Sequence, residues 1–191
     1  MAIQSKFDDW NKIYRYASPD SELEQIALES MTTLAQTCDD WGKIWDCSPV
    51  GSELRQTAFN KMVALAQTFA DWRSVYYPAP ADSKLRQTAH DKMIALAQTY
   101  DDWRDVLRTA PLDSKLQQTA LDKMIALAQT CDDWGSIYCH VPVDSKLRQT
   151  ALDKMIALAR TSKDWCDVWR TAPVGSKLRQ TALRKLAELK A

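Results

Sequence analysis

Tryptophan recurs along this chain at an interval of 31 residues, and an aspartate precedes each of these tryptophans. The tryptophans are Trp10, Trp41, Trp72, Trp103, Trp134 and Trp165. A constant period of about 20 to 50 residues is typical of stacked supersecondary units that bury their apolar faces against one another. We therefore expect residues 1–191 to form a single repeat domain in which each unit contacts mainly its neighbours.

The charge balance and the cysteines restrict the partners and the compartment. The chain has 25 basic and 25 acidic residues, whereas proteins that grip phosphates usually carry a basic surplus, so nucleic acid is disfavoured. No apolar run is long enough to cross a bilayer, and the N-terminal segment MAIQSKFDDW lacks the apolar stretch of a secretory signal. The five cysteines include no C-x-x-C pair and form no even framework. We expect no membrane contact, reduced thiols and a cytoplasmic location.

One unit, residues 113–142, illustrates the pattern. Ser114 is a typical helix N-cap, and we predict a long helix from there to about Gln129. Its apolar residues cover about half of the circumference, which suits a helix packed against both its hairpin partner and the next unit. They are Leu116, Ala120, Leu121, Met124, Ile125, Leu127 and Ala128.

A short helix is predicted to follow. Thr130 and Asp133 form a capping-box pattern at its start, where acidic side chains also favour the positive helix end. Trp134 and Ile137 begin a narrow apolar stripe, and Pro142 stops the helix. Both connections are short, so successive helices should be antiparallel neighbours.

The same register recurs in every unit, which predicts the buried positions. A methionine file at helical spacing is expected to fill the core. It consists of Met31, Met62, Met93, Met124 and Met155. The tryptophans share their stripe with Ile or Val three residues later, so we expect buried indoles rather than an exposed aromatic ladder. The next stripe position, which varies, is expected at the edge of a groove; it holds Tyr14, Trp45, Tyr76, Leu107, Tyr138 and Trp169.

A hairpin with a leading Trp, a small Ala, a large apolar residue and a closing Pro resembles the αα-solenoid superfamily, which includes tetratricopeptide, Sel1-like and HEAT-type repeats. The resemblance covers essentially the whole chain, but a tetratricopeptide unit has about 34 residues, and here Pro142 lies only eight residues after Trp134. It implies an all-α, right-handed αα-hairpin solenoid (alpha-alpha superhelix) of 31-residue repeats with about twelve helices. Near-identical segments such as DSKLRQTALDKMIALA are compatible with recent duplication or with a consensus-like, engineered repeat.

The repeat boundaries follow from this register. We predict a half-unit at 1–17, units at roughly 18–48, 49–79, 80–110, 111–141 and 142–172, and a terminal capping helix at 173–191. In that last helix Glu188 and Lys190 replace Ala157 and Ala159 of the preceding unit. Such polar substitutions keep a terminal repeat soluble.

Short-helix positions that differ between units are candidates for partner binding. The residue after each Trp and the residue four positions later share a helix face. We predict that this strip contributes Arg73, Tyr77, Arg104, Arg108 and Arg170 to a binding surface. Unconstrained variation of exposed residues would give the same pattern.

The long helix carries the same glutamine in every unit. The candidates are Gln56, Gln87, Gln118 and Gln149. They could bind an extended peptide backbone, bridge adjacent units or simply reflect duplication. A neighbouring basic file of Arg55, Arg86, Arg148 and Arg179 favours an acidic partner, although nearby aspartates offset it.

Catalytic, metal-binding and cofactor-binding patterns are absent from the sequence. The chain has four glycines and no phosphate-binding Gly-rich loop, and His90 and His140 belong to different repeat positions. We expect a non-enzymatic scaffold without a cofactor that binds a protein or peptide segment. The alternatives are a modular nucleic-acid-binding helical repeat and a structural, self-assembling repeat array, in which the chain would be a homo-oligomer.

Overall fold

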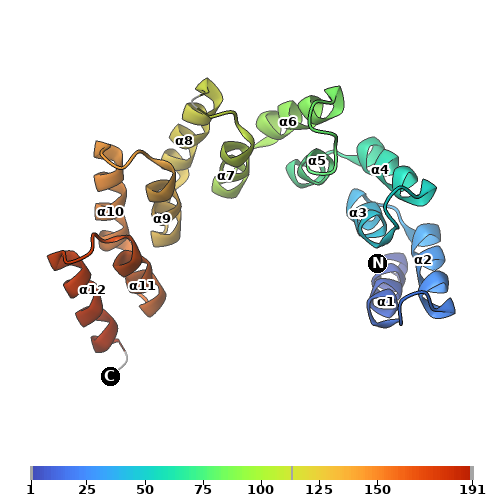
Figure 1. The fold of residues 1–191 in the computed structure, drawn as a ribbon, viewed down its shortest axis with the longest axis horizontal. Coiled ribbons are helices and arrows are strands. Elements are labelled where there is room, and N and C mark those ends of the chain that lie inside the picture. The colour runs from blue at the N-terminus through green and yellow to red at the C-terminus, as the bar shows by residue number, and fades with distance from the viewer. Residues whose placement is uncertain (1, 113, 190–191) are drawn as a thin grey trace. The chain divides into compact units, whose positions relative to one another are not determined.

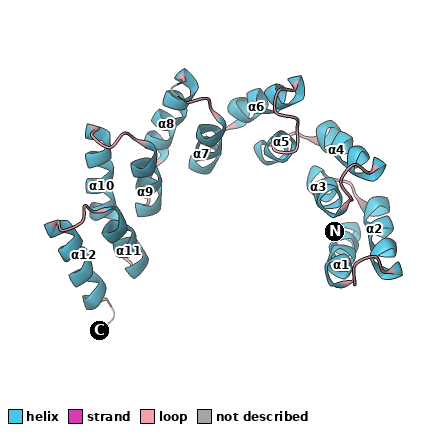
Figure 2. Ribbon diagram, in the orientation of Figure 1, coloured by secondary structure: helices cyan, strands magenta, loops and turns pink. Residues whose placement is uncertain are grey.

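The computed structural model describes residues 2–112 and 114–189, and every regular element in these ranges is helical (Figure 1, Figure 2). These described residues form twelve helices and no strand. The helices are α1 (Ala2–Tyr16), α2 (Glu22–Leu34), α3 (Cys38–Cys47), α4 (Glu53–Leu65), α5 (Phe69–Tyr76), α6 (Lys84–Leu96), α7 (Tyr100–Thr109), α8 (Lys115–Leu127), α9 (Cys131–His140), α10 (Lys146–Leu158), α11 (Ser162–Thr171) and α12 (Lys177–Glu188). The all-α prediction and the predicted helix number are confirmed.

The long, even-numbered helices begin after a serine that caps the first turn, as predicted. In α8 the Ser114 hydroxyl accepts a hydrogen bond from the Gln117 N–H at 3.1 Å. The capping serines are Ser21, Ser52, Ser83, Ser114, Ser145 and Ser176. Helix α8 ends at Leu127, slightly before the predicted end near Gln129. The reason is local, because the Gln129 N–H donates to the Asp133 carboxylate at 2.9 Å instead of continuing the helix.

The short helices α3, α5, α7, α9 and α11 each begin with the predicted capping box. In α9 the Thr130 hydroxyl accepts from the Asp133 N–H at 3.1 Å, and the Asp133 carboxylate accepts from the Thr130 N–H at 2.9 Å. These bonds satisfy backbone donors that the first helical turn leaves without partners. Each capping box therefore sets the point at which the chain turns from a long helix into a short one.

The chain divides into two compact units, Met1–Ala97 with α1 to α6 and Gln98–Ala191 with α7 to α12. Within each unit, consecutive helices pack as hairpins, and long helices also contact the short helix that follows. Helix α3 contacts α5 and α9 contacts α11, so short helices form one layer of each unit and long helices the other (Figure 1). This sequential packing is that of a helical repeat protein. None of the helices in the described ranges combines the length and apolar character needed to cross a bilayer.

The core of both units is built from the predicted files. The five methionines of the long helices are at most 2% exposed. Four of the six tryptophans that recur every 31 residues are buried at 7 to 9% exposure, namely Trp41, Trp103, Trp134 and Trp165. Trp10 and Trp72 are partly exposed, which limits the prediction that every indole is buried.

Tyrosine hydroxyls link consecutive short helices. Tyr14 donates to the Cys47 carbonyl at 2.8 Å, Tyr100 to the Asp133 carbonyl at 2.6 Å and Tyr138 to the Thr171 carbonyl at 3.1 Å. Two of the acceptors, the carbonyls of Cys47 and Thr171, lie in the last turn of their helices, where the helix itself supplies no donor. These bonds place each ring in the seam between two neighbouring hairpins.

The predicted capping helix is α12. Ala187 and Glu188 are exposed, and Lys190 lies outside the described residues. Nevertheless, Leu183 and Leu189 remain 52% and 49% exposed. The polar substitutions therefore leave apolar surface uncovered on α12.

Candidate binding site

A concave feature in the second unit, between α9, α10 and α11, contains residues that the sequence singled out. We call it the α9–α11 groove; its volume is about 500 Å³. It is lined by Asp132, Gly135, Ser136, Tyr138 and Cys139 from α9, Arg148 and Met155 from α10, and Asp167, Arg170 and Thr171 from α11. A volume of this size suits a small ligand or a few residues of a peptide.

Gly135 opens the floor of this groove. A Cβ atom at this position would lie 3.3 Å from Cε of the buried Met155, which is tighter than ordinary contact. The corresponding glycine of the first unit, Gly42, has more room, with Met62 Cε at 3.7 Å. The α9–α11 groove therefore depends on glycine at this position, where two other 31-residue repeats carry Arg73 and Arg104.

Charges of both signs line the walls. Arg170 pairs with Asp167 at 3.1 Å, and Asp132 pairs with Lys163 at 3.5 Å. The side chains of Arg170, Asp132 and Lys163 are all well exposed. Exposed pairs of this kind contribute little to stability, so these groups remain available to a charged partner.

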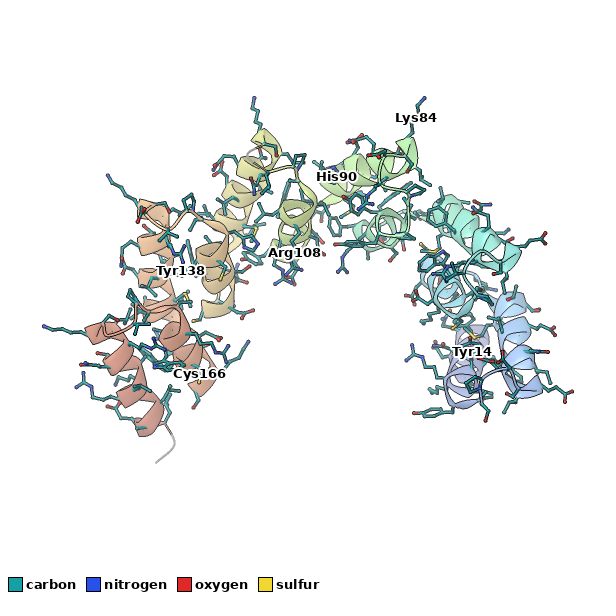
Figure 3. All side chains as sticks on the ribbon, viewed as in Figure 1. Tyr14, Lys84, His90, Arg108, Tyr138 and Cys166 are labelled. Atoms are coloured by element: carbon teal, nitrogen blue, oxygen red, sulfur yellow. The ribbon has the colours of Figure 1, made fainter. Side chains whose placement is uncertain are left out.

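The Tyr138–Arg148 pair forms one end of the groove. The Arg148 guanidinium lies 4.2 Å from the centre of the Tyr138 ring and donates to the Val141 carbonyl at 3.4 Å. Figure 3 places Tyr138 between α9 and α10. Because the tyrosine hydroxyl also bonds to Thr171 on α11, the pair is held from three helices. A rigid aromatic and cationic surface results.

A second groove adjoins the first at this pair. We call it the turn groove of the second unit; its volume is about 420 Å³. Its lining residues are Tyr138, Val143, Asp144, Ser145, Lys146, Arg148, Gln149, Leu152 and Pro173. Val143 is 74% exposed, which is unusual for an aliphatic side chain beside charged groups. A matching groove of about 460 Å³ occurs in the first unit around Trp45, Val50, Arg55 and Gln56.

Stacking of arginine on an aromatic ring recurs in both units. The pairs, with guanidinium-to-ring-centre distances of 3.9 to 4.5 Å, are Arg55 with Trp45, Arg86 with Tyr76, Arg148 with Tyr138, and Arg179 with Trp169. Where the arginine is replaced by Gln117, the aromatic is replaced by the buried Leu107. The two positions lie ten residues apart, and four of the six repeats combine an aromatic residue with an arginine there. In the first hairpin, Glu24 replaces the arginine although the aromatic Tyr14 is kept. Comparing repeats within the sequence could have suggested the contact.

The predicted glutamine file is exposed, but its side chains bond within their own helices. Each amide donates to the residue four positions later: Gln56 to Asn60, Gln87 to Asp91, Gln118 to Asp122 and Gln149 to Asp153, at 2.8 to 3.0 Å. None of these bonds bridges two units of the repeat. Gln56 and Gln149 line turn grooves.

The remaining predicted residues lie elsewhere on the short helices. Arg73 and Tyr77 come together at the end of α5, where the guanidinium lies 5.8 Å from the centre of the exposed ring. Arg104 and Arg108 on α7 pair with Asp101 at 2.9 Å and Asp105 at 3.6 Å. Neither α7 arginine lines the two grooves of the second unit. Among the predicted residues, Arg170 lines the α9–α11 groove and Gln149 lines the turn groove of the second unit. The Tyr138–Arg148 pair lines both grooves.

Burial raises the pKa of the Cys131 thiol to about 11, so the thiol is protonated at neutral pH. No group of three His, Cys, Asp or Glu side chains in the described residues is arranged to hold a metal ion. The site offers instead aromatic, aliphatic and ionic contacts. No family model, curated protein or solved structure matches this chain.

Proposed function

We propose that this protein is a non-enzymatic scaffold that binds a protein or peptide segment along the α9–α11 groove and the adjoining turn groove. One observation carries the proposal. Met124 and Met155 occupy a constant repeat position and are fully buried, whereas Cys139 and Arg170 occupy a varying position and line the α9–α11 groove. Variation concentrated on a groove wall is expected where each unit contacts a different part of a partner.

The chemistry of the two grooves suits an extended segment with mixed character. Val143 and the Tyr138 ring provide apolar contacts, and buried aromatic anchors usually dominate binding energy. Arg170 and Asp132 provide one charge of each sign near the α9–α11 groove. The matching segment would carry an apolar side chain flanked by an acidic and a basic one.

The same proposal includes a finer architecture and location. Serine caps recur at residues 21, 52, 83, 114, 145 and 176, which supports 31-residue repeats with the boundaries given above. We propose that these repeats form a right-handed αα-solenoid and that the protein acts in the cytoplasm.

The test is a screen of the full chain against an immobilised library of short peptides, followed by calorimetric titration of the best binder. We expect Arg170→Glu and Ser136→Arg to weaken binding by about tenfold or more, because both alter the groove wall. The matched control is Arg184→Glu, an equal charge change at an exposed position of α12 outside both grooves. Binding that the site variants leave unchanged, or that only a salt-sensitive oligonucleotide achieves, would overturn the proposal.

A further inference from the structure

We propose that the exposed face of α12 in one copy of this chain binds the exposed face of α1 and α2 in a second copy. Copies would then stack head to tail through the same contact that joins consecutive hairpins inside each unit. This inference concerns different surfaces from the peptide-binding grooves and does not depend on them.

The α12 face centres on Leu183 and Leu186. Leu121 and Leu152 occupy the position of Leu183 in the two preceding long helices, where they are 8% and 5% exposed, whereas Leu183 is 52% exposed. Leu186 takes the position of the fully buried Met155 and is itself partly exposed. In α10 this face is covered by the following short helix, α11. Helix α12 therefore exposes a face that, in the preceding long helices α8 and α10, packs against the next short helix.

The complementary face lies on α1 and α2. Ile13 is partly exposed, whereas Ile137 and Val168, at the same repeat position, are completely buried. Trp10 is likewise more exposed than Trp165. Leu23 on α2 is 51% exposed. Helix α1 thus carries the tryptophan stripe of the short helices but has no long helix packed on that side.

The two faces are the halves of an interface that the chain already makes several times. A long helix packs on the next short helix at α2–α3, α4–α5, α8–α9 and α10–α11. The stripe of Trp10 and Ile13 matches that of Trp165 and Val168, which α11 places beside α10. Because a second copy brings both halves, it is the occupant that satisfies both exposed faces.

The polar substitutions on α12 do not block this face. Glu188 lies five residues after Leu183, which places it about 140° away around the helix. There it pairs with Lys185 at 2.7 Å. The contact joins two different surfaces, so it is heterologous and can continue from copy to copy.

The experiment is analytical ultracentrifugation of the full chain over about a hundredfold range of concentration. We expect the mass to rise above the 21.7 kDa of one chain as concentration increases. Leu183→Glu and Leu23→Lys should each remain monomeric. Both positions are about half exposed, so neither change should unfold the chain, and circular dichroism melting checks this.

Mixing the two variants gives the decisive result. Each retains the face that the other has lost, so an equimolar mixture should form a dimer and nothing larger. The matched control is Gln180→Glu on α12, whose equivalent Gln149 stays exposed beside a packed short helix, and it should assemble like the original chain. A chain that stays monomeric at all concentrations, an assembly that neither variant disrupts, or a mixture that fails to associate would each overturn the proposal.

Discussion

At the scale of single residues, His90 is the most informative departure from the repeat. It takes the position of Leu121 and Leu152, is 8% exposed, and lies 5.6 Å from the Tyr76 ring between ring centres. Its Nε2 atom has no hydrogen-bond partner in the described residues. A buried polar atom without a partner costs about 1 to 3 kcal/mol. Aligning the repeats places His90 at a position that leucine occupies in other repeats. The alignment cannot show that one of its nitrogens lacks a partner.

We predict that His90→Leu raises the free energy of unfolding by about 1 kcal/mol at neutral pH, with a larger gain in acid. Burial lowers the pKa of His90, with Asp91 opposing the shift, so the folded state favours the neutral ring. Stability contributed by this group is therefore complete above the ordinary histidine pKa of about 6.5 and declines as pH falls toward the lower folded pKa.

Urea denaturation at about pH 7.5 and pH 5 measures this difference. The control is His140→Gln, which removes a histidine from an exposed position. An equal loss of stability in acid for the original chain and for His90→Leu would show that His90 is not responsible.

At the scale of helices, the repeated hairpin is stabilised at its turn and in its core by different means. Capping boxes set where each short helix begins, and the methionine and tryptophan files bury the faces that meet. Within this pattern Trp103 on α7 is 8% exposed, with Lys123 of α8 above its ring at 6.0 Å. Trp72, at the same repeat position on α5, is more exposed. The two tryptophans therefore allow burial to be compared within one sequence context.

We predict that Trp103→Ala lowers the free energy of unfolding by about 3 to 5 kcal/mol, because the substitution leaves a large cavity between α7 and α8. Trp72→Ala should cost less, since part of that ring already contacts water. Denaturant titrations of both variants at one temperature provide the measurement. A loss below about 1 kcal/mol for Trp103→Ala would show that the indole does not contribute as a buried contact.

At the scale of the whole molecule, the stability of a repeat protein is approximately a sum of terms from each unit and each contact between neighbours. The two compact units are built from the same kind of hairpin. No single 31-residue repeat is therefore needed to complete a common core. The length of a deletion should then matter more than its place, because the helix period determines which residues face the core.

We predict that deleting residues 120–150 leaves a folded, shorter protein. The deletion joins Thr119 to Ala151, the equivalent of Ala120, so α8 continues into α10 in register. Deleting residues 120–147 instead inserts three extra residues into the joined helix and rotates Ser114 and Leu116 by about 300° relative to the buried face. Circular dichroism melting should show a cooperative transition for the first variant and a markedly lower melting temperature for the second. Equal melting temperatures would contradict the predicted 31-residue register.

The sequence by itself determined where helices begin and which positions are buried. Caps such as Ser114 and Thr130 act through hydrogen bonds a few residues away, and the methionine file follows from helical periodicity, so both are local properties. Arg170 and Gln149 were recognisable as candidate site residues for the same reason. Only the tertiary structure decided that they lie on either side of the Tyr138–Arg148 pair and that Val143 is exposed beside it. Those facts depend on how hairpins pack, because packing brings together side chains from three helices, and no single helix period contains that information.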